Sequence, residues 1–192
     1  ISGPGDLEGS VLGAPPPDGA WAQFPSFAKA NNIDIGKIKV EPVGFPTREP
    51  MLAEGKVDSV TGFSFSSYLN LVRLGVPEND ISTILMADHG LKPYGNAVIV
   101  NTEYAEANGD TVKAFLGAVA AGWKDAIADP TAAAAALVKR NPAADAALEE
   151  RRLELAINAN VLTDYVKANG MGGIDSVRFS AAIKQLSETY DY

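Results

Sequence analysis

Residues 1–100 alternate between short apolar runs and amphipathic stretches, and each apolar run ends in a turn. Alternation at this spacing is typical of βαβ units, which build parallel or mixed sheets. Asp18 is placed to cap a first helix whose apolar face includes Trp21, and further helices are predicted over 47–55 and 66–75, each closed by a glycine. The predicted strands are residues 11–14, 38–43, 59–62, 83–86 and 96–100. We therefore expect an α/β unit with a narrow sheet.

The residue pattern changes after residue 100, where helical patterns follow one another without a strand. Helix starts are predicted at Asp110, Asp129 and Asp175, whose carboxylates can accept hydrogen bonds from the first turn. A longer helix is predicted over 143–161. The last helix is expected to face inward through Phe179, Ile183, Leu186 and Tyr190. The predicted division is an α/β domain over 1–100 and a helical segment over 101–192.

Composition excludes several classes of function. The 192 residues hold 24 acidic and 16 basic side chains, a formal charge of −8, which argues against nucleic acid as a partner. There is no cysteine and a single histidine, His89, so thiol nucleophiles, disulfides, cysteine-ligated metals and histidine-rich metal sites are excluded within one chain. No Walker A, G-x-S-x-G or H-E-x-x-H motif occurs. We expect no catalytic residues, no metal and no cofactor.

The positions of the loops indicate where a ligand could bind. Ligands of open α/β sheets bind beyond the carboxyl ends of the strands, where helix N-termini offer backbone donors. The loops that qualify are residues 15–21, 44–48, 62–66 and 87–90, which together supply aromatic rings, hydroxyls, one arginine and two carboxylates. This mixture suits a small polar or aromatic molecule. A structural role stays open, because Phe63 and Phe65 alternate about Ser64 as core residues do.

Several segments resemble one known family. They read DLEGSVLGAP, FPSFAKANNID, LAEGKVDSVTGF, LMADHGLKPYGNAVIVN and FLGAVAAGWKDAIADP, and their order along the chain is more specific than any one of them. The sequence is similar to the NMT1/THI5-like substrate-binding proteins of bacterial ABC importers, a group that stands beside binders of taurine, alkanesulfonates, nitrate and the thiamine pyrimidine.

The resemblance implies a type II periplasmic-binding-protein fold, in which two α/β lobes close on a ligand. Residues 1–100 would be the second lobe, with a small mixed sheet, and the helical segment would pack on both lobes. The N-terminal part of the first lobe is expected to precede residue 1, so that the chain is a truncated fragment. The implied function is extracytoplasmic solute capture, in the periplasm or on a lipid anchor outside the cell, with delivery to a membrane permease. Surface left by the missing lobe is expected to favour self-association.

The family's ligand contacts imply seven site residues in this sequence: Asp18, Trp21, Thr47, Arg48, Phe63, Ser64 and Asp88. A ring of Trp21 or Phe63 would stack on a planar ligand, and Arg48 would hold an anionic group. Asp88 would pair with an amine or amidine. The aromatic rings and carboxylates favour a thiamine-precursor pyrimidine slightly over a sulfonate or nitrate.

Two other functions stay open. Fungal relatives in this superfamily make the thiamine pyrimidine with pyridoxal phosphate and iron, chemistry that calls for several histidines and cysteines, and His89 alone does not meet that need. A ligand-sensing regulatory domain of the same fold is the second alternative. No DNA-binding segment accompanies it here, and fold by itself does not decide function.

Overall fold

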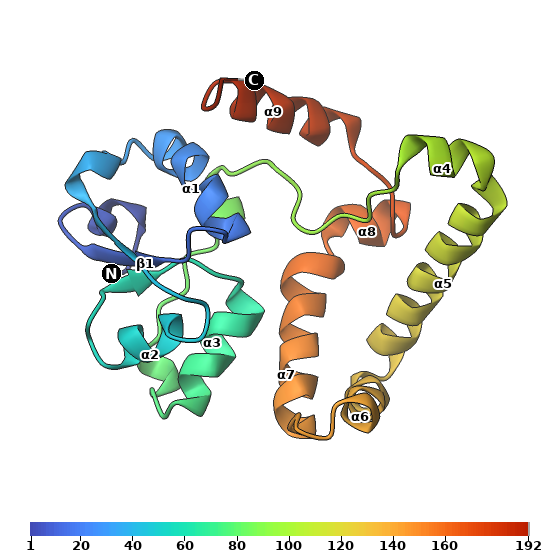
Figure 1. The fold of residues 1–192 in the computed structure, drawn as a ribbon, viewed down its shortest axis with the longest axis horizontal. Helices are drawn as coiled ribbons and strands as arrows, with labels where there is room; N and C mark the ends of the chain where they lie inside the picture. Colours follow the sequence, from blue (N-terminus) through green and yellow to red (C-terminus); the bar gives the residue numbers. More distant parts are fainter. Residues whose placement is uncertain (192) are drawn as a thin grey trace. The chain divides into compact units, whose positions relative to one another are not determined.

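The computed structural model describes residues 1–191, which divide into two compact units (Figure 1). An α/β unit consists of Ile1–Pro93 together with the segment from Asp175 onward, and a helical unit spans Tyr94–Ile174. The predicted division at residue 100 placed the last helix with the helical segment. The structure instead places that helix with the α/β unit, because its side chains bond to the backbone there.

The sheet of the α/β unit has three short strands in the order β2–β1–β3. These are β1 (Val11–Ala14), β2 (Lys39–Pro42) and β3 (Ser59–Val60). Both pairings are parallel, with Leu12 of β1 facing Val40 on one side and Ser59 on the other. The three strands lie where the apolar runs predicted them. The expected mixed sheet is wrong for the described residues, since every pair in it is parallel.

A helix follows each strand and begins at the carboxyl edge of the sheet. These helices are α1 (Gly19–Ala30), α2 (Arg48–Ala53) and α3 (Ser64–Arg73). Asp18 caps α1 as predicted, because its carboxylate accepts a hydrogen bond from the Ala20 amide. Short 3-10 turns complete the unit, at η1 (Pro4–Leu7), η2 (Ile35–Lys37), η3 (Glu78–Asp80) and η4 (Met86–His89).

The core of this unit lies between β1, α1 and the segment after η4. Leu12, Phe24 and Phe27 are almost fully buried, and Ile38 and Leu91 join them. Each large side chain buried in this way contributes about 1.5–3 kcal/mol to folding. The core holds α1 against one face of the sheet and so fixes the position of its N-terminus.

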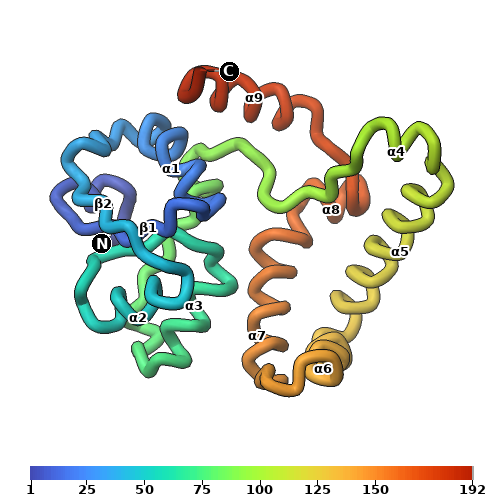
Figure 2. The backbone as a smooth tube through the Cα atoms, viewed as in Figure 1, coloured from blue at the N-terminus to red at the C-terminus, as the bar shows by residue number. Residues whose placement is uncertain are grey.

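The predicted strands over 83–86 and 96–100 are wrong. Met86 begins the 3-10 turn η4, and residues 96–100 form no regular element. Figure 2 traces the chain between α3 and α4 as a largely irregular green path. An apolar run becomes a strand only where a neighbouring strand satisfies its backbone groups, and the described residues provide none here. Ile99 accordingly stays 90% exposed.

Helix α9 (Ser176–Ser187) docks on the α/β unit through polar side chains. The Gln185 side chain accepts from the Lys92 amide at 2.8 Å and donates to the Gly90 carbonyl at 3.0 Å. Arg178 donates to the carbonyls of Lys92 and Pro93. The predicted inward face is wrong for Phe179 and Ile183, which are 46% and 51% exposed. The hydrogen bonds of Gln185 and Arg178 hold another side of the helix against the unit.

The helical unit consists of α4 (Thr102–Ala107), α5 (Gly109–Ala128), α6 (Pro130–Arg140), α7 (Ala146–Ala156), the π-helical turn η5 (Ile157–Val161) and α8 (Asp164–Asn169). Asp129 caps α6 as predicted. The N-cap of α5 is Asn108 rather than Asp110, and the helix predicted over 143–161 is α7 continued by the π turn. Within residues 1–191, no helix is long and apolar enough to span a membrane.

Candidate functional site

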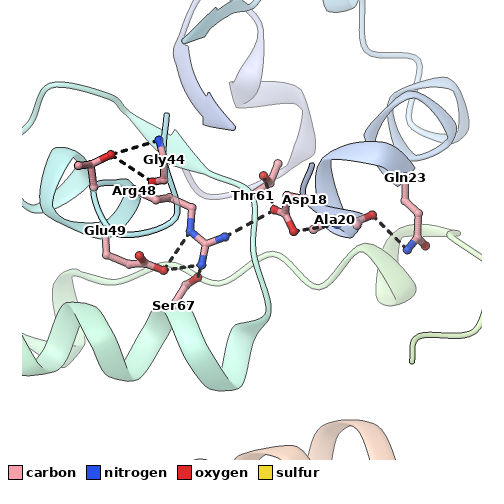
Figure 3. A network of polar contacts seen from close by, with 10 residues as sticks. Asp18, Ala20, Gln23, Gly44, Arg48, Glu49, Thr61 and Ser67 are labelled. Atoms are coloured by element: carbon pink, nitrogen blue, oxygen red, sulfur yellow. Dashed lines mark hydrogen bonds and ion pairs between the residues drawn. The ribbon is translucent and has the colours of Figure 1, made fainter. Parts of the chain in front are cut away.

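Buried polar side chains gather at the carboxyl edge of the sheet, where the three strand-to-helix loops meet. We call Asp18, Arg48, Glu49, Thr61 and Ser67 the edge network (Figure 3). Each of them is at most 9% exposed. Buried polar groups are costly unless they are hydrogen-bonded, and the contacts in this network meet that requirement from side chains of all three loops.

Arg48 lies at the centre of the edge network. Its Nε and Nη2 donate to Glu49 Oε1 at 3.0 and 2.7 Å, and Nη2 also donates to Ser67 Oγ at 3.0 Å. Nη1 lies 3.5 Å from Asp18 Oδ2. One guanidinium therefore joins the start of α2 to α3 and to the N-cap of α1. Its planar fork of donors suits this role, which a lysine ammonium could not fill in the same geometry.

Asp18 connects the network to the sheet. Its Oδ1 accepts from the Ala20 amide at 3.2 Å, which caps α1, and its Oδ2 accepts from Thr61 Oγ1 at 2.9 Å. Thr61 follows β3 directly. Because Asp18 is only 4% exposed, its carboxylate is committed to these partners and to Arg48 rather than offered to solvent.

The pKa of Glu49 is lowered from its ordinary 4.5. Burial alone would raise this pKa, but the hydrogen bonds with Arg48 and Ser67 and the charge of Arg48 outweigh that penalty. Glu49 is therefore ionised at neutral pH. It lies in the first turn of α2, where a carboxylate also interacts favourably with the positive end of a helix.

Two groups close in on the Arg48 guanidinium. The Phe45 ring lies with its centroid 5.8 Å from Arg48 Cζ, within the range of a cation–π contact. The backbone at Gly62 lies so near that a Cβ there would be 3.1 Å from Arg48 Cζ and would collide with Ser67 Oγ. A residue without a side chain at position 62 is thus needed for the network to form as it stands.

Aromatic rings remain exposed beside the buried network. Phe63 and Phe65 stack with centroids 5.4 Å apart and planes 19° apart, at the start of α3. Phe63 is 42% exposed and Phe45 is 48% exposed. Small-molecule sites combine apolar and aromatic side chains with a few fixed polar groups, and this edge offers both kinds. This edge is therefore the candidate binding surface of the unit.

Comparison with family models gives one match, which runs from residue 1 to residue 133 and is described as NMT1/THI5 like. The chain belongs to the NMT1/THI5-like family. The resemblance found in the sequence is thereby confirmed, and the match includes the whole edge network. This family consists mostly of substrate-binding proteins of ABC transporters, although it also includes a synthase. A comparison with curated proteins gives no match.

The structure brings together only part of the predicted site of this NMT1/THI5-like chain. Asp18 and Arg48 are in ion-pair contact, and Ser64 and Phe63 start the helix that carries Ser67. The remaining predicted residues are Thr47, Trp21 and Asp88. Thr47 is exposed and bonds to the backbone of Gly44, which shapes the loop before α2.

Trp21 and Asp88 lie apart from the network in the described contacts. The Trp21 ring stacks on Phe24 with centroids 5.4 Å apart and packs against the core, which is a structural environment. Asp88 lies exposed in η4. The described contacts join it to no member of the edge network, so its proposed role as a partner for an amine is without geometric support.

Sequence reasoning missed Glu49, Thr61 and Ser67. Glu49 follows Arg48 directly, and the side chains of adjacent helical residues seldom face each other, so a helical pattern does not predict their ion pair. The strand predicted over 59–62 includes Thr61, and the helix predicted over 66–75 includes Ser67. A usable signal was present: Gly62 sits between a strand and a helix, and glycine at such a point often marks a close approach of the backbone to another group.

Proposed function

We propose that this chain is the solute-binding part of an ABC importer, which captures a small polar or heteroaromatic molecule outside the cytoplasm and delivers it to a membrane permease. The proposal rests on membership of the NMT1/THI5-like family and on the edge network. In it, the α/β unit is one lobe of a type II binding protein and the helical unit belongs to the same assembly. The location would be the periplasm, or the outer face of the membrane on a lipid anchor.

The observation that carries the proposal is the exposure of two phenylalanine rings beside a buried, hydrogen-bonded polar network. Phe45 and Phe63 keep 48% and 42% of their surface open to solvent, although both adjoin the ends of parallel strands where ligands of α/β folds bind. Rings so placed can stack on a planar ligand. A thiamine-precursor pyrimidine is the slightly favoured ligand, ahead of a sulfonate or nitrate.

The proposal includes no catalytic step. One histidine and no cysteine give little material for a pyridoxal phosphate and iron reaction of the kind expected for the synthase-like alternative. His89, the single histidine, lies edge-on to Phe27 with centroids 6.5 Å apart, and its carbonyl accepts from Asn31. These contacts are structural.

Saturation-transfer NMR with the whole chain and 4-amino-2-methylpyrimidine tests the proposal, because this method detects weak binding by a single surface. We expect signals from the ring protons of the probe, and their reduction in Phe63→Ala. Phe179→Ala is the matched control, since Phe179 is 46% exposed on α9 and should leave binding unchanged. Equal loss in both variants, or no transfer to the probe at millimolar concentration, would contradict the proposed site.

A further inference from the structure

The partners of Arg48 decide whether this side chain can bind a ligand. A guanidinium binds an anionic ligand only when its N–H donors point at the ligand. Here Nε and Nη2 donate to Glu49 and Ser67, and Nη1 faces Asp18. Every nitrogen of this side chain therefore faces an acceptor of the protein itself, and the residue is only 7% exposed.

The charges of the edge network also disfavour an anionic ligand. Two carboxylates, Asp18 and Glu49, share the single guanidinium, so the cluster as a whole is anionic. The same carboxylates also occupy the positive ends of two helices, since Asp18 caps α1 and Glu49 lies in the first turn of α2. An oxyanion brought to this edge would meet negative charge at short range in a partly desolvated setting, where repulsion is strongest.

What the edge leaves exposed is not cationic. The exposed side chains of the three loops include the rings of Phe45 and Phe63 and the hydroxyl-bearing Thr47, while Ser64 is half-buried at the start of α3. Rings and hydroxyls can hold a planar molecule by stacking and by neutral hydrogen bonds. They supply no counter-ion for a sulfonate or a nitrate.

We infer that Arg48 is a positioning residue, and that this edge selects neutral or cationic ring molecules over oxyanions. The inference rests on the proposed function for its ligand and deepens it, because it names the charge class that the surface accepts. Arg48 acts through Asp18, Glu49 and Ser67: it fixes the three loops that present the rings. This assignment replaces the expectation that Arg48 itself holds an anionic group.

The test compares two ring probes of opposite charge tendency, 4-amino-2-methylpyrimidine and benzenesulfonate, with the whole chain in saturation-transfer NMR at low salt. We expect the aminopyrimidine to bind at least about tenfold more tightly than the sulfonate. In Glu49→Gln, which removes one negative charge and releases donors of Arg48, the sulfonate should gain affinity and the difference should narrow. Circular dichroism of the variant establishes that it folds. Equal or tighter binding of the sulfonate by the wild type would overturn the inference and leave solute binding intact.

Arg48→Lys tests the positioning role without any ligand. This variant keeps the charge and loses the planar fork, so we expect a clear fall in the urea midpoint of unfolding. Lys37→Arg, at an exposed ion pair with Glu8, is the matched control and should leave the midpoint unchanged. A stable Arg48→Lys protein would overturn the positioning role. If neither probe binds while Arg48→Lys is destabilised, the proposed function fails and the positioning role stands.

Discussion

Thr61 Oγ1 donates a hydrogen bond to Asp18 Oδ2 at 2.9 Å, and this contact joins the end of β3 to the N-cap of α1. Both side chains are nearly inaccessible, with 3% and 4% of their surface exposed. The bond therefore links the outer strand on one side of the sheet to the helix that follows the central strand. It holds one carboxylate oxygen of Asp18 while the other caps α1.

Thr61→Val is expected to destabilise the α/β unit by about 1.5–3 kcal/mol, because it removes a donor from a buried carboxylate with almost no change of shape. The change should appear as a lower urea midpoint. Thr83→Val, at an exposed position of the same unit, serves as the control and should change the midpoint little. An unchanged midpoint in Thr61→Val would show that the bond adds nothing to the edge network.

Gly62→Ala is expected to cost about 1–3 kcal/mol, as is typical when a methyl group is forced into a filled space. The new Cβ would collide with Ser67 Oγ and approach Arg48 Cζ to 3.1 Å, so the hydrogen bond between those two side chains would be displaced. Gly19→Ala is the control, because a Cβ there meets nothing within 4 Å. Thermal unfolding of both variants checks the prediction, which fails if they melt together.

The lowered pKa of Glu49 predicts how stability depends on pH. A carboxyl group whose pKa is lower in the folded than in the unfolded chain stabilises the fold at pH values above its unfolded pKa, which is near the ordinary 4.5. This stabilisation is lost as the pH falls through the pKa of the folded state. Urea midpoints measured from pH 7 down to pH 3 should therefore fall less steeply for Glu49→Gln than for the wild type. Ser67→Ala removes one of the hydrogen bonds that lower this pKa, and should move the acid transition to higher pH. Parallel curves for wild type and Glu49→Gln would contradict the prediction.

The sequence predicted the three paired strands and the helices after them because those segments carry local signals. Alternating apolar residues mark the strands, Asp18 accepts the first-turn amide, and Gly55 and Gly75 take positive φ angles of 68° and 88° after the helices, as a helix-ending glycine does. The runs over 83–86 and 96–100 carry the same apolar signal. They differ only in lacking a strand beside them, which is a tertiary property that a local pattern does not contain.

The candidate site shows the same limit. Asp18, Arg48 and Phe63 could be predicted because they follow strands whose carboxyl ends meet at one edge. The partners of Arg48 could not, because whether a guanidinium faces a ligand or another part of the protein depends on which side chains lie within 3 to 4 Å of it. Glu49 and Ser67 decide that question here, and they belong to two different helices.

Exposed apolar residues on the two units predict self-association. Phe179 and Ile183 of α9 and Phe115 of α5 each expose 46% or more of their surface. Apolar side chains that gather on a protein surface favour contact with another molecule. Light scattering at rising protein concentration should show a growing mean mass, and Ile183→Ser should reduce it. A mass that stays at one chain across the range would contradict this prediction.

The clamp between α9 and the chain leaving the α/β unit yields the last prediction. Gln185 holds Gly90 and Lys92 through both ends of its amide group, and Arg178 holds Lys92 and Pro93. The residues that follow α9 also contact this unit through polar groups, since the Tyr190 hydroxyl donates to the Ala22 carbonyl and Lys29 Nζ donates to the Glu188 carbonyl. The free energy of local opening depends on such contacts.

Gln185→Ala should therefore raise hydrogen exchange of the Lys92 amide by about tenfold and that of the α9 amides by a similar factor. Lys184→Ala, on the exposed side of the same helix, is the control and should leave both unchanged. Equal exchange in the two variants would contradict this prediction. It would indicate that buried apolar contacts such as that of Ala182 hold α9 in place.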